Sequence, residues 1–262
     1  MIISPIECGE RHQTLYCLRK RTIARQSVPA EILKRADGST YDDHPLWMMK
    51  EFRIGSACDP EEAAERVNKI LLVGGSLSLP VYLSQHRWTW LVFQPFLTET
   101  RTALSLDDIS ETGLLDDLAL AHSHGLAHGD FKLNNFGINP DGRAHLFDWE
   151  PTLRIWNAGQ KSTRTNYWSL HPADKTERRV SLRGDRYGLL VWSLILFYGE
   201  RFQSRILSNA PACEMLASYV NRTLSLSLMD FYAGFRELLE IHENSEEEFF
   251  REFQTTPRSS FF

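Results

Sequence analysis

The chain has 262 residues, a formal net charge of −5 and 42% hydrophobic residues. This length allows one large domain or two small lobes with a substantial core, and the composition is that of a globular rather than a disordered protein. The negative net charge gives no reason to expect nucleic acid or an anionic membrane as the main partner.

The cysteine spacing and the N-terminus both predict a cytoplasmic protein. The four cysteines show no C-x-x-C pattern, so we expect reduced thiols rather than a metal site. The first residues lack the basic and apolar regions of a signal peptide. The longest apolar stretch, residues 189–198, is shorter than the ~20 residues that span a bilayer and predicts a buried core helix. The oligomeric state is not predicted.

The first hundred residues predict mostly strands. Strands are expected at 15–18, 46–52, 79–83 and 89–93, with a polar connection at 29–45. Between them, Asp59, Pro60 and the acids Glu61 and Glu62 form a helix start, and the helix is expected to end near Val73.

The rest of the chain predicts mostly helices. Apolar residues at Leu114, Leu115, Leu118 and Ala121 give a helical stripe that begins at 110–111 and ends at Gly125. A hairpin is expected from the runs 135–138 and 144–147, because residues 139–142 read Asn-Pro-Asp-Gly. Three helices are expected near 211–222, 228–241 and 244–254.

Residues 124–150 bring together the side chains that phosphoryl transfer needs. That reaction requires a group that aims the nucleophile, oxygen ligands for Mg²⁺ and cations on the phosphates. Asp130 can receive the proton of an attacking hydroxyl, and Lys132 can reach the transferred phosphate. Asn135 and Asp148 supply the oxygen ligands.

The same stretch resembles the protein kinase-like superfamily. Residues 128–135, HGDFKLNN, resemble the catalytic loop H-R-D-L-K-x-x-N, and residues 146–150, LFDWE, resemble the strand and D-F-G that follow it. The resemblance implies an α+β bilobal fold that uses ATP and Mg²⁺. Residues 1–95 would form a β-rich N-lobe with one main helix, and residues 96–262 a small, mostly helical C-lobe.

The resemblance also implies nucleotide-binding residues in the N-lobe. The run 46–52 resembles the V-A-I-K strand, so Lys50 would bind the α- and β-phosphates. Glu65, or alternatively Glu62, would be its acidic partner. The glycine-rich phosphate loop G-x-G-x-x-G is absent, and Gly9 is equally compatible with an ordinary turn and with a phosphate role.

Residues 94–97 resemble the hinge that holds the adenine. By that alignment, Phe93 is the gatekeeper, and Gln94 and Phe96 offer backbone contacts to the base. Pro95 leaves the hinge with one backbone donor fewer.

The acceptor is predicted by weighing two branches of the superfamily. Lys132 and residues 167–185, which resemble the end of an activation segment, are similar to serine/threonine protein kinases. The H-G-D and D-W-E versions are similar to aminoglycoside, choline and lipopolysaccharide-sugar kinases, in which Glu150 would be a further metal ligand. The long activation-like segment favours a protein substrate. The first hypothesis is therefore an active protein kinase of the compact, bacterial or effector type. A small-molecule or lipopolysaccharide-sugar kinase is the second, and a nucleotide-binding pseudokinase that acts as an interaction module is the third.

Two positions are expected to hold the catalytic loop. Asp185 would cap the buried helix and bind the loop backbone, and His128 would hold the loop by hydrogen bonds. Gly129 replaces the arginine that usually pairs with a phosphorylated activation loop, so the resemblance implies activity without activating phosphorylation.

Overall fold

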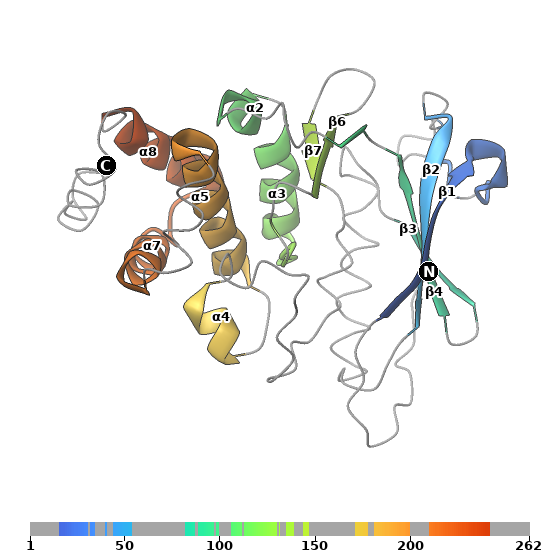
Figure 1. Cartoon of the computed structure of the whole chain (residues 1–262), viewed down its shortest axis with the longest axis horizontal. Coiled ribbons are helices and arrows are strands. Elements are labelled where there is room, and N and C mark those ends of the chain that lie inside the picture. Colours follow the sequence, from blue (N-terminus) through green and yellow to red (C-terminus); the bar gives the residue numbers. More distant parts are fainter. Residues whose placement is uncertain are drawn as a thin grey trace.

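In this computed structural model, the strands of the larger sheet precede all the described α-helices along the chain and lie in a different part of the molecule (Figure 1). The structure describes residues 16–30, 32–34, 40, 44–53, 82–86, 89–96, 98–99, 106–111, 113–129, 131, 135–138, 144–146, 171–177, 181–199 and 210–241. The expected helix at 59–73, Gly9 and the expected helix at 244–254 lie outside these residues. The mixed α and β class is confirmed.

The larger sheet contains β1 (Tyr16–Ala24), β2 (Leu46–Arg53), β3 (Tyr82–His86) and β4 (Thr89–Pro95). Its order is β1-β2-β4-β3, and each neighbouring pair is antiparallel. The predictions of β2 and β4 are confirmed. β1 is longer than expected, and β3 begins three residues later than the predicted strand.

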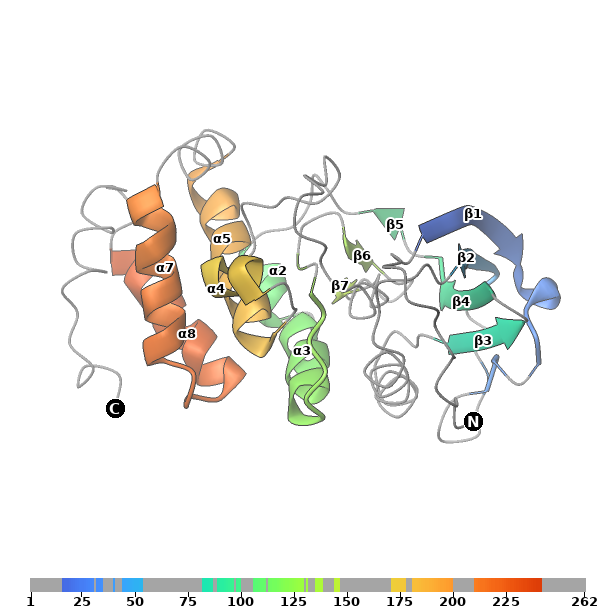
Figure 2. The same cartoon turned by 90° about the horizontal axis from the view of Figure 1, so that it is seen from below.

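An apolar cluster covers one face of this sheet. Trp47 and Met49 of β2 contribute to it together with Phe93, which is paired with Met49 in the sheet. The segment that follows β1 begins with the 3₁₀ helix η1 (Arg25–Ser27). Its residues Val28, Ile32 and Leu33 are buried in the same cluster. The buried members of the cluster are Val28, Ile32, Leu33, Trp47, Met49 and Phe93. The segment 25–34 lies on the side of the sheet away from β5, β6 and β7 (Figures 1 and 2).

A smaller antiparallel sheet follows, with the order β5-β6-β7. It contains β5 (Thr98–Glu99), β6 (Phe136–Ile138) and β7 (Ala144–Leu146). Ile138 pairs with Ala144 and Phe136 with Leu146, so the predicted hairpin is confirmed. Its turn, 139–142, lies outside the described residues.

The helix before the hairpin is split in two. α2 (Leu106–Glu111) and α3 (Leu114–Ser123) are separated at Gly113, whose φ of +82° ends helical geometry. The expected single start at 110–111 is therefore wrong, because this glycine interrupts the run. The predicted apolar stripe of α3 is confirmed, since all four of its residues are buried.

The predicted helix end at Gly125 is confirmed, and a Schellman motif closes α3 there. Gly125 has a φ of +68°, and its N–H donates to the carbonyl of His122 over 2.9 Å. The N–H of Leu126 donates to the carbonyl of Ala121 over 2.9 Å. Both bonds satisfy carbonyls that the helix end would otherwise leave open, and they fix where the next loop leaves the helix.

The C-terminal part packs around one buried helix (Figure 2). Its helices are α4 (Pro172–Glu177), α5 (Leu182–Tyr198), α7 (Ala210–Arg222) and α8 (Leu228–Ile241). Residues 189–195 of α5 are all buried, which confirms the predicted core helix. Among the described helices, none is both long enough and apolar enough to cross a membrane.

Arg186 joins α5 to the connection between α7 and α8. Its Nη1 donates to the carbonyl of Thr223 over 2.9 Å, and its Nη2 to that of Leu226 over 2.8 Å. The guanidinium carbon lies 5.0 Å from the centroid of the Phe231 ring. Burial lowers the pKa of Arg186 from its ordinary value because desolvation disfavours the charged form.

Candidate active site

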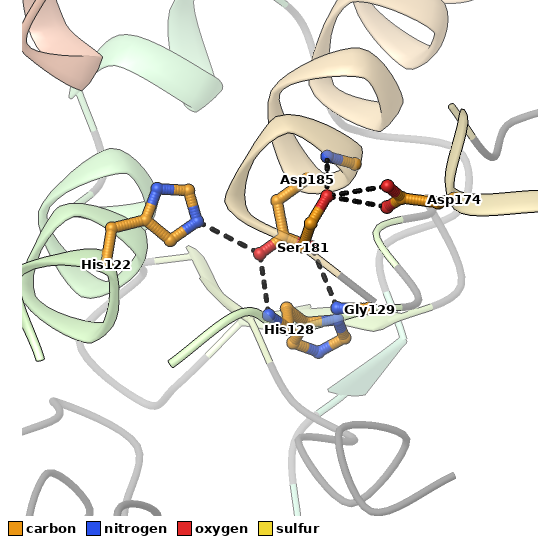
Figure 3. A network of polar contacts seen from close by, with 7 residues as sticks. His122, His128, Gly129, Asp174, Ser181 and Asp185 are labelled. Carbon is orange, nitrogen blue, oxygen red and sulfur yellow. Dashed lines mark hydrogen bonds and ion pairs between the residues drawn. The ribbon is translucent and has the colours of Figure 1, made fainter. Parts of the chain in front are cut away.

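The carboxylate of Asp185 holds three groups at the start of the H-G-D segment (Figure 3). Its Oδ2 accepts hydrogen bonds from the backbone N–H of His128 over 2.6 Å and from Nε2 of His122 over 2.9 Å. Its Oδ1 accepts from the backbone N–H of Gly129 over 2.8 Å. Because a carboxylate only accepts, the hydrogen of the His122 bond resides on Nε2. Asp185 is 1% exposed, so the bonds are shielded from water.

The predicted contact between Asp185 and the loop backbone is thus confirmed, but its predicted capping role is wrong. α5 begins at Leu182, and its N-cap is Ser181, whose Oγ accepts from the N–H of Gly184 over 3.1 Å. Asp185 lies one turn inside the helix, and from there its side chain reaches the loop.

A second residue of α5 holds the loop on the other side of position 130. Nε1 of Trp192 donates to the carbonyl of Phe131 over 2.8 Å. Trp192 follows Asp185 by seven residues, or about two helical turns, so both side chains leave the same face of α5. Residues 128, 129 and 131 are therefore bound to one buried helix. Asp130 and Lys132, the predicted catalytic residues, lie outside the described residues.

The backbone conformation of Gly129 accounts for a glycine at the position where the catalytic-loop motif that the sequence resembles has arginine. Its φ is +79°, in the left-handed region that side chains with a Cβ disfavour. In this chain the loop therefore reaches Asp185 through a glycine, whose left-handed backbone costs little strain.

Asn135 is the predicted metal ligand that the structure describes. It is 2% exposed and immediately precedes β6, so the hairpin sets its position. Asp148 and Glu150 follow β7 and lie outside the described residues. Within the described residues, no group of three or more His, Cys, Asp or Glu side chains could hold a metal ion.

A polar cluster at the start of α5 was not predicted from the sequence. Ser181 Oγ donates to the carboxylate of Asp174 over 2.7 Å (Figure 3). Nε of Arg183 donates to the same carboxylate over 3.0 Å. The cluster connects α4 to the turn of α5 that carries Asp185. The Ser181 cap could have been found from the serine just before the helix, but its contact with α4 joins separate elements and leaves no local pattern.

Lys50 lies inside β2 rather than at the end of a strand. β2 continues to Arg53, and Lys50 pairs with Lys20 of β1 and Val92 of β4. The residue is 2% exposed, although lysine is almost never fully buried without a compensating interaction. Its predicted partners, Glu65 and Glu62, lie outside the described residues.

The register of β2 and β4 decides which side chains share the face of Lys50. Side chains alternate along a strand, so Gln94, which pairs with Met48, lies on the Lys50 face, whereas Phe93 lies on the opposite face with Met49. A gatekeeper and a phosphate-binding lysine must contact the same nucleotide. The predictions that Phe93 is the gatekeeper and that Lys50 binds the phosphates therefore exclude each other.

The predicted hinge residues differ in what they offer a ligand. Gln94 is 4% exposed, and it still belongs to β4. Phe96 is 42% exposed, but its N–H donates to the carbonyl of Leu46 over 2.9 Å. The amide of Phe96 is therefore used by the sheet. No protein-family model matches this sequence, and no curated protein matches it.

Proposed function

We propose that the protein is an ATP- and Mg²⁺-dependent phosphotransferase in which Asp130 is the base. One observation carries the proposal: α5 binds residues 128, 129 and 131, the neighbours of position 130, through Asp185 and Trp192. A base for phosphoryl transfer works by aiming a hydroxyl, so it requires a loop of fixed geometry. A loop bound to the central core helix meets that requirement.

The donor groups suit the proposed cofactors. Asn135, Asp148 and Glu150 offer the hard oxygen ligands that Mg²⁺ prefers, and bound Mg²⁺ would neutralise charge on the phosphates. Lys50 would bind the α- and β-phosphates from the buried face of β2, with Glu65 as its partner. Lys132 would contact the transferred phosphate. The burial of Lys50 supports this role, since a lysine that served only solubility would lie in water.

The order of elements supports a bilobal arrangement. All four strands of the larger sheet lie within the proposed N-lobe, residues 1–95. All described α-helices lie within the proposed C-lobe, residues 96–262. The nucleotide would bind between them, against the face of β2 and β4 that carries Lys50.

The proposed acceptor is a serine or threonine hydroxyl of a protein. Lys132 and the long segment before α5 support this choice. α4 and its bond network through Asp174 and Ser181 give that segment a fixed end close to Asp185. Because the bonds to Asp185 are made by backbone amides and His122, the loop is held without the arginine that phosphorylated activation segments use.

The test is incubation of the purified protein with γ-labelled ATP and Mg²⁺, alone and with a mixed-protein lysate. Asp130→Asn and Asp148→Ala are compared with Asp116→Asn, an exposed carboxylate of α3. We expect label in protein bands with the wild type and Asp116→Asn, and a loss of about 10²-fold or more in the two site variants. Asp148→Ala should also weaken nucleotide binding, whereas Asp130→Asn should not.

Other outcomes would reject parts of the proposal. ATP turnover without label in protein would reject the protein acceptor and indicate a small-molecule kinase. Thermal stabilisation by ATP without turnover would reject catalysis and indicate a pseudokinase. Equal labelling by the wild type and Asp130→Asn would exclude Asp130 as the base.

A further inference from the structure

The side chain of Gln94 is buried with an acceptor that the described part of the chain does not satisfy. The residue is almost fully buried, and its Oε1 receives no hydrogen bond from any described residue. Buried polar groups in native proteins almost always have partners, and an unsatisfied one destabilises the fold. A buried glutamine at this position is therefore accounted for if a bound molecule supplies the missing donor.

The register directs this acceptor to the face of the sheet that carries Lys50. Gln94 pairs with Met48, and Lys50 pairs with Val92, two residues before Gln94. Gln94 and Lys50 are thus diagonal neighbours on adjacent strands, whose side chains are roughly 7–8 Å apart. The opposite face is filled by the cluster of Trp47, Met49 and Phe93. The Lys50 face is turned toward the part of the molecule that contains β5–β7 (Figures 1 and 2).

Among the described residues that follow Gln94, the backbone adds no free donor. Pro95 has no N–H, and the N–H of Phe96 is bound to the carbonyl of Leu46. Among the described residues, a ligand that meets this end of β4 therefore meets the acceptor of the Gln94 side chain and no free N–H of residues 95 and 96. Such a surface selects a ligand that brings an N–H donor.

We propose that Oε1 of Gln94 accepts a hydrogen bond from the 6-amino group of the adenine base. The proposal rests on the proposed nucleotide-dependent function, in which Lys50 binds the phosphates of the same molecule. It makes the glutamine side chain the group that selects the 6-amino group. Guanine and hypoxanthine carry a carbonyl at the same ring position, which would face Oε1 with a second acceptor.

The test compares ATP with purine riboside triphosphate, which lacks only the 6-amino group, by calorimetric titration in the presence of Mg²⁺. The wild type should bind ATP about three- to tenfold more tightly, which is the range of one hydrogen bond. Gln94→Leu should bind the two nucleotides equally. Gln26→Leu makes the same change at an exposed residue of η1, beyond the opposite face, and should retain the preference.

Each result decides the proposal. Equal affinities in the wild type, or a preference retained by Gln94→Leu, would overturn the role of Gln94 while leaving the proposed function intact. Failure of the wild type to bind either nucleotide would overturn both. Gln94→Met, which has nearly the same length, provides a second variant and should also lose the preference. GTP binding as tight as ATP binding would likewise contradict the proposal.

Discussion

Replacing Asp185 by asparagine tests how strongly α5 holds the loop. Asparagine presents one acceptor oxygen and one NH₂ group. If the oxygen keeps the bonds to His122 and His128, the NH₂ group faces the N–H of Gly129. That buried amide then lacks an acceptor, which costs about 1–3 kcal/mol. The remaining two hydrogen bonds then join neutral groups, so each weakens by about 1 kcal/mol. This loss is partly offset because the asparagine buries no charge. We expect a net loss of about 2–4 kcal/mol in the free energy of unfolding.

Urea unfolding followed by tryptophan fluorescence measures this loss, and hydrogen exchange of peptides covering residues 124–131 shows whether it is local. Exchange should be faster in Asp185→Asn, and phosphotransfer should fall with it. Asp116→Asn, at an exposed position, should stay within about 0.5 kcal/mol of the wild type. If Asp185→Asn has the stability of Asp116→Asn and unchanged exchange, these bonds do not hold the loop.

Three further changes test other contacts. Trp192→Phe removes the N–H that binds the carbonyl of Phe131. It should lower the free energy of unfolding in urea by about 1–3 kcal/mol and speed hydrogen exchange at residues 128–131. Unchanged exchange would refute the anchoring of the loop by Trp192. Gly184→Ala places a Cβ in steric conflict with Oδ2 of Asp174. It should lower the free energy of unfolding by about 1–3 kcal/mol, and by much less in an Asp174→Ala background, whereas equal costs would exclude the clash. Burial raises the pKa of Tyr232 to about 12, above its value of about 10 in the unfolded chain. The unfolded state therefore loses this proton first, and stability falls as the pH rises from about 10 to about 12. Tyr232→Phe should make that slope shallower by about 1.4 kcal/mol per pH unit, and a slope equal to the wild type would contradict the shift.

The elements that the sequence predicts well are those with a local cause. The glycine at 125 ends α3 because the left-handed conformation closes a helix within a few residues. The hairpin of β6 and β7 follows from turn residues that lie between its strands. The apolar run of α5 is buried because it is apolar on every side. In each case the residues that decide the structure are neighbours in the sequence.

The faces of the larger sheet could not be predicted in this way. A motif alignment that is wrong by one residue moves a side chain to the other face of a strand. The alignment placed Phe93 at the nucleotide, whereas its pairing with Met49 places it in the opposite apolar cluster. Gln94, predicted to act through its backbone, instead brings its side chain to the Lys50 face. Only the register between β2 and β4, which depends on residues about forty-five positions apart, decides between these arrangements.

The loop around position 130 shows why a carboxylate is kept inside the core. The described residues 126–129 and 131 form neither helix nor strand, so their buried amides cannot use a regular hydrogen-bond ladder. Asp185 satisfies two of these amides, and Trp192 satisfies the carbonyl of Phe131. An apolar residue at 185 would avoid the cost of burying a charge, but it would leave both amides unpaired and the loop without a fixed position. The loop thus takes its geometry from α5, the helix with the most complete burial, while Lys50 and Gln94 take theirs from the sheet. This separation predicts that changes in α5 act on the chemical step, and changes in β2 and β4 act on nucleotide affinity.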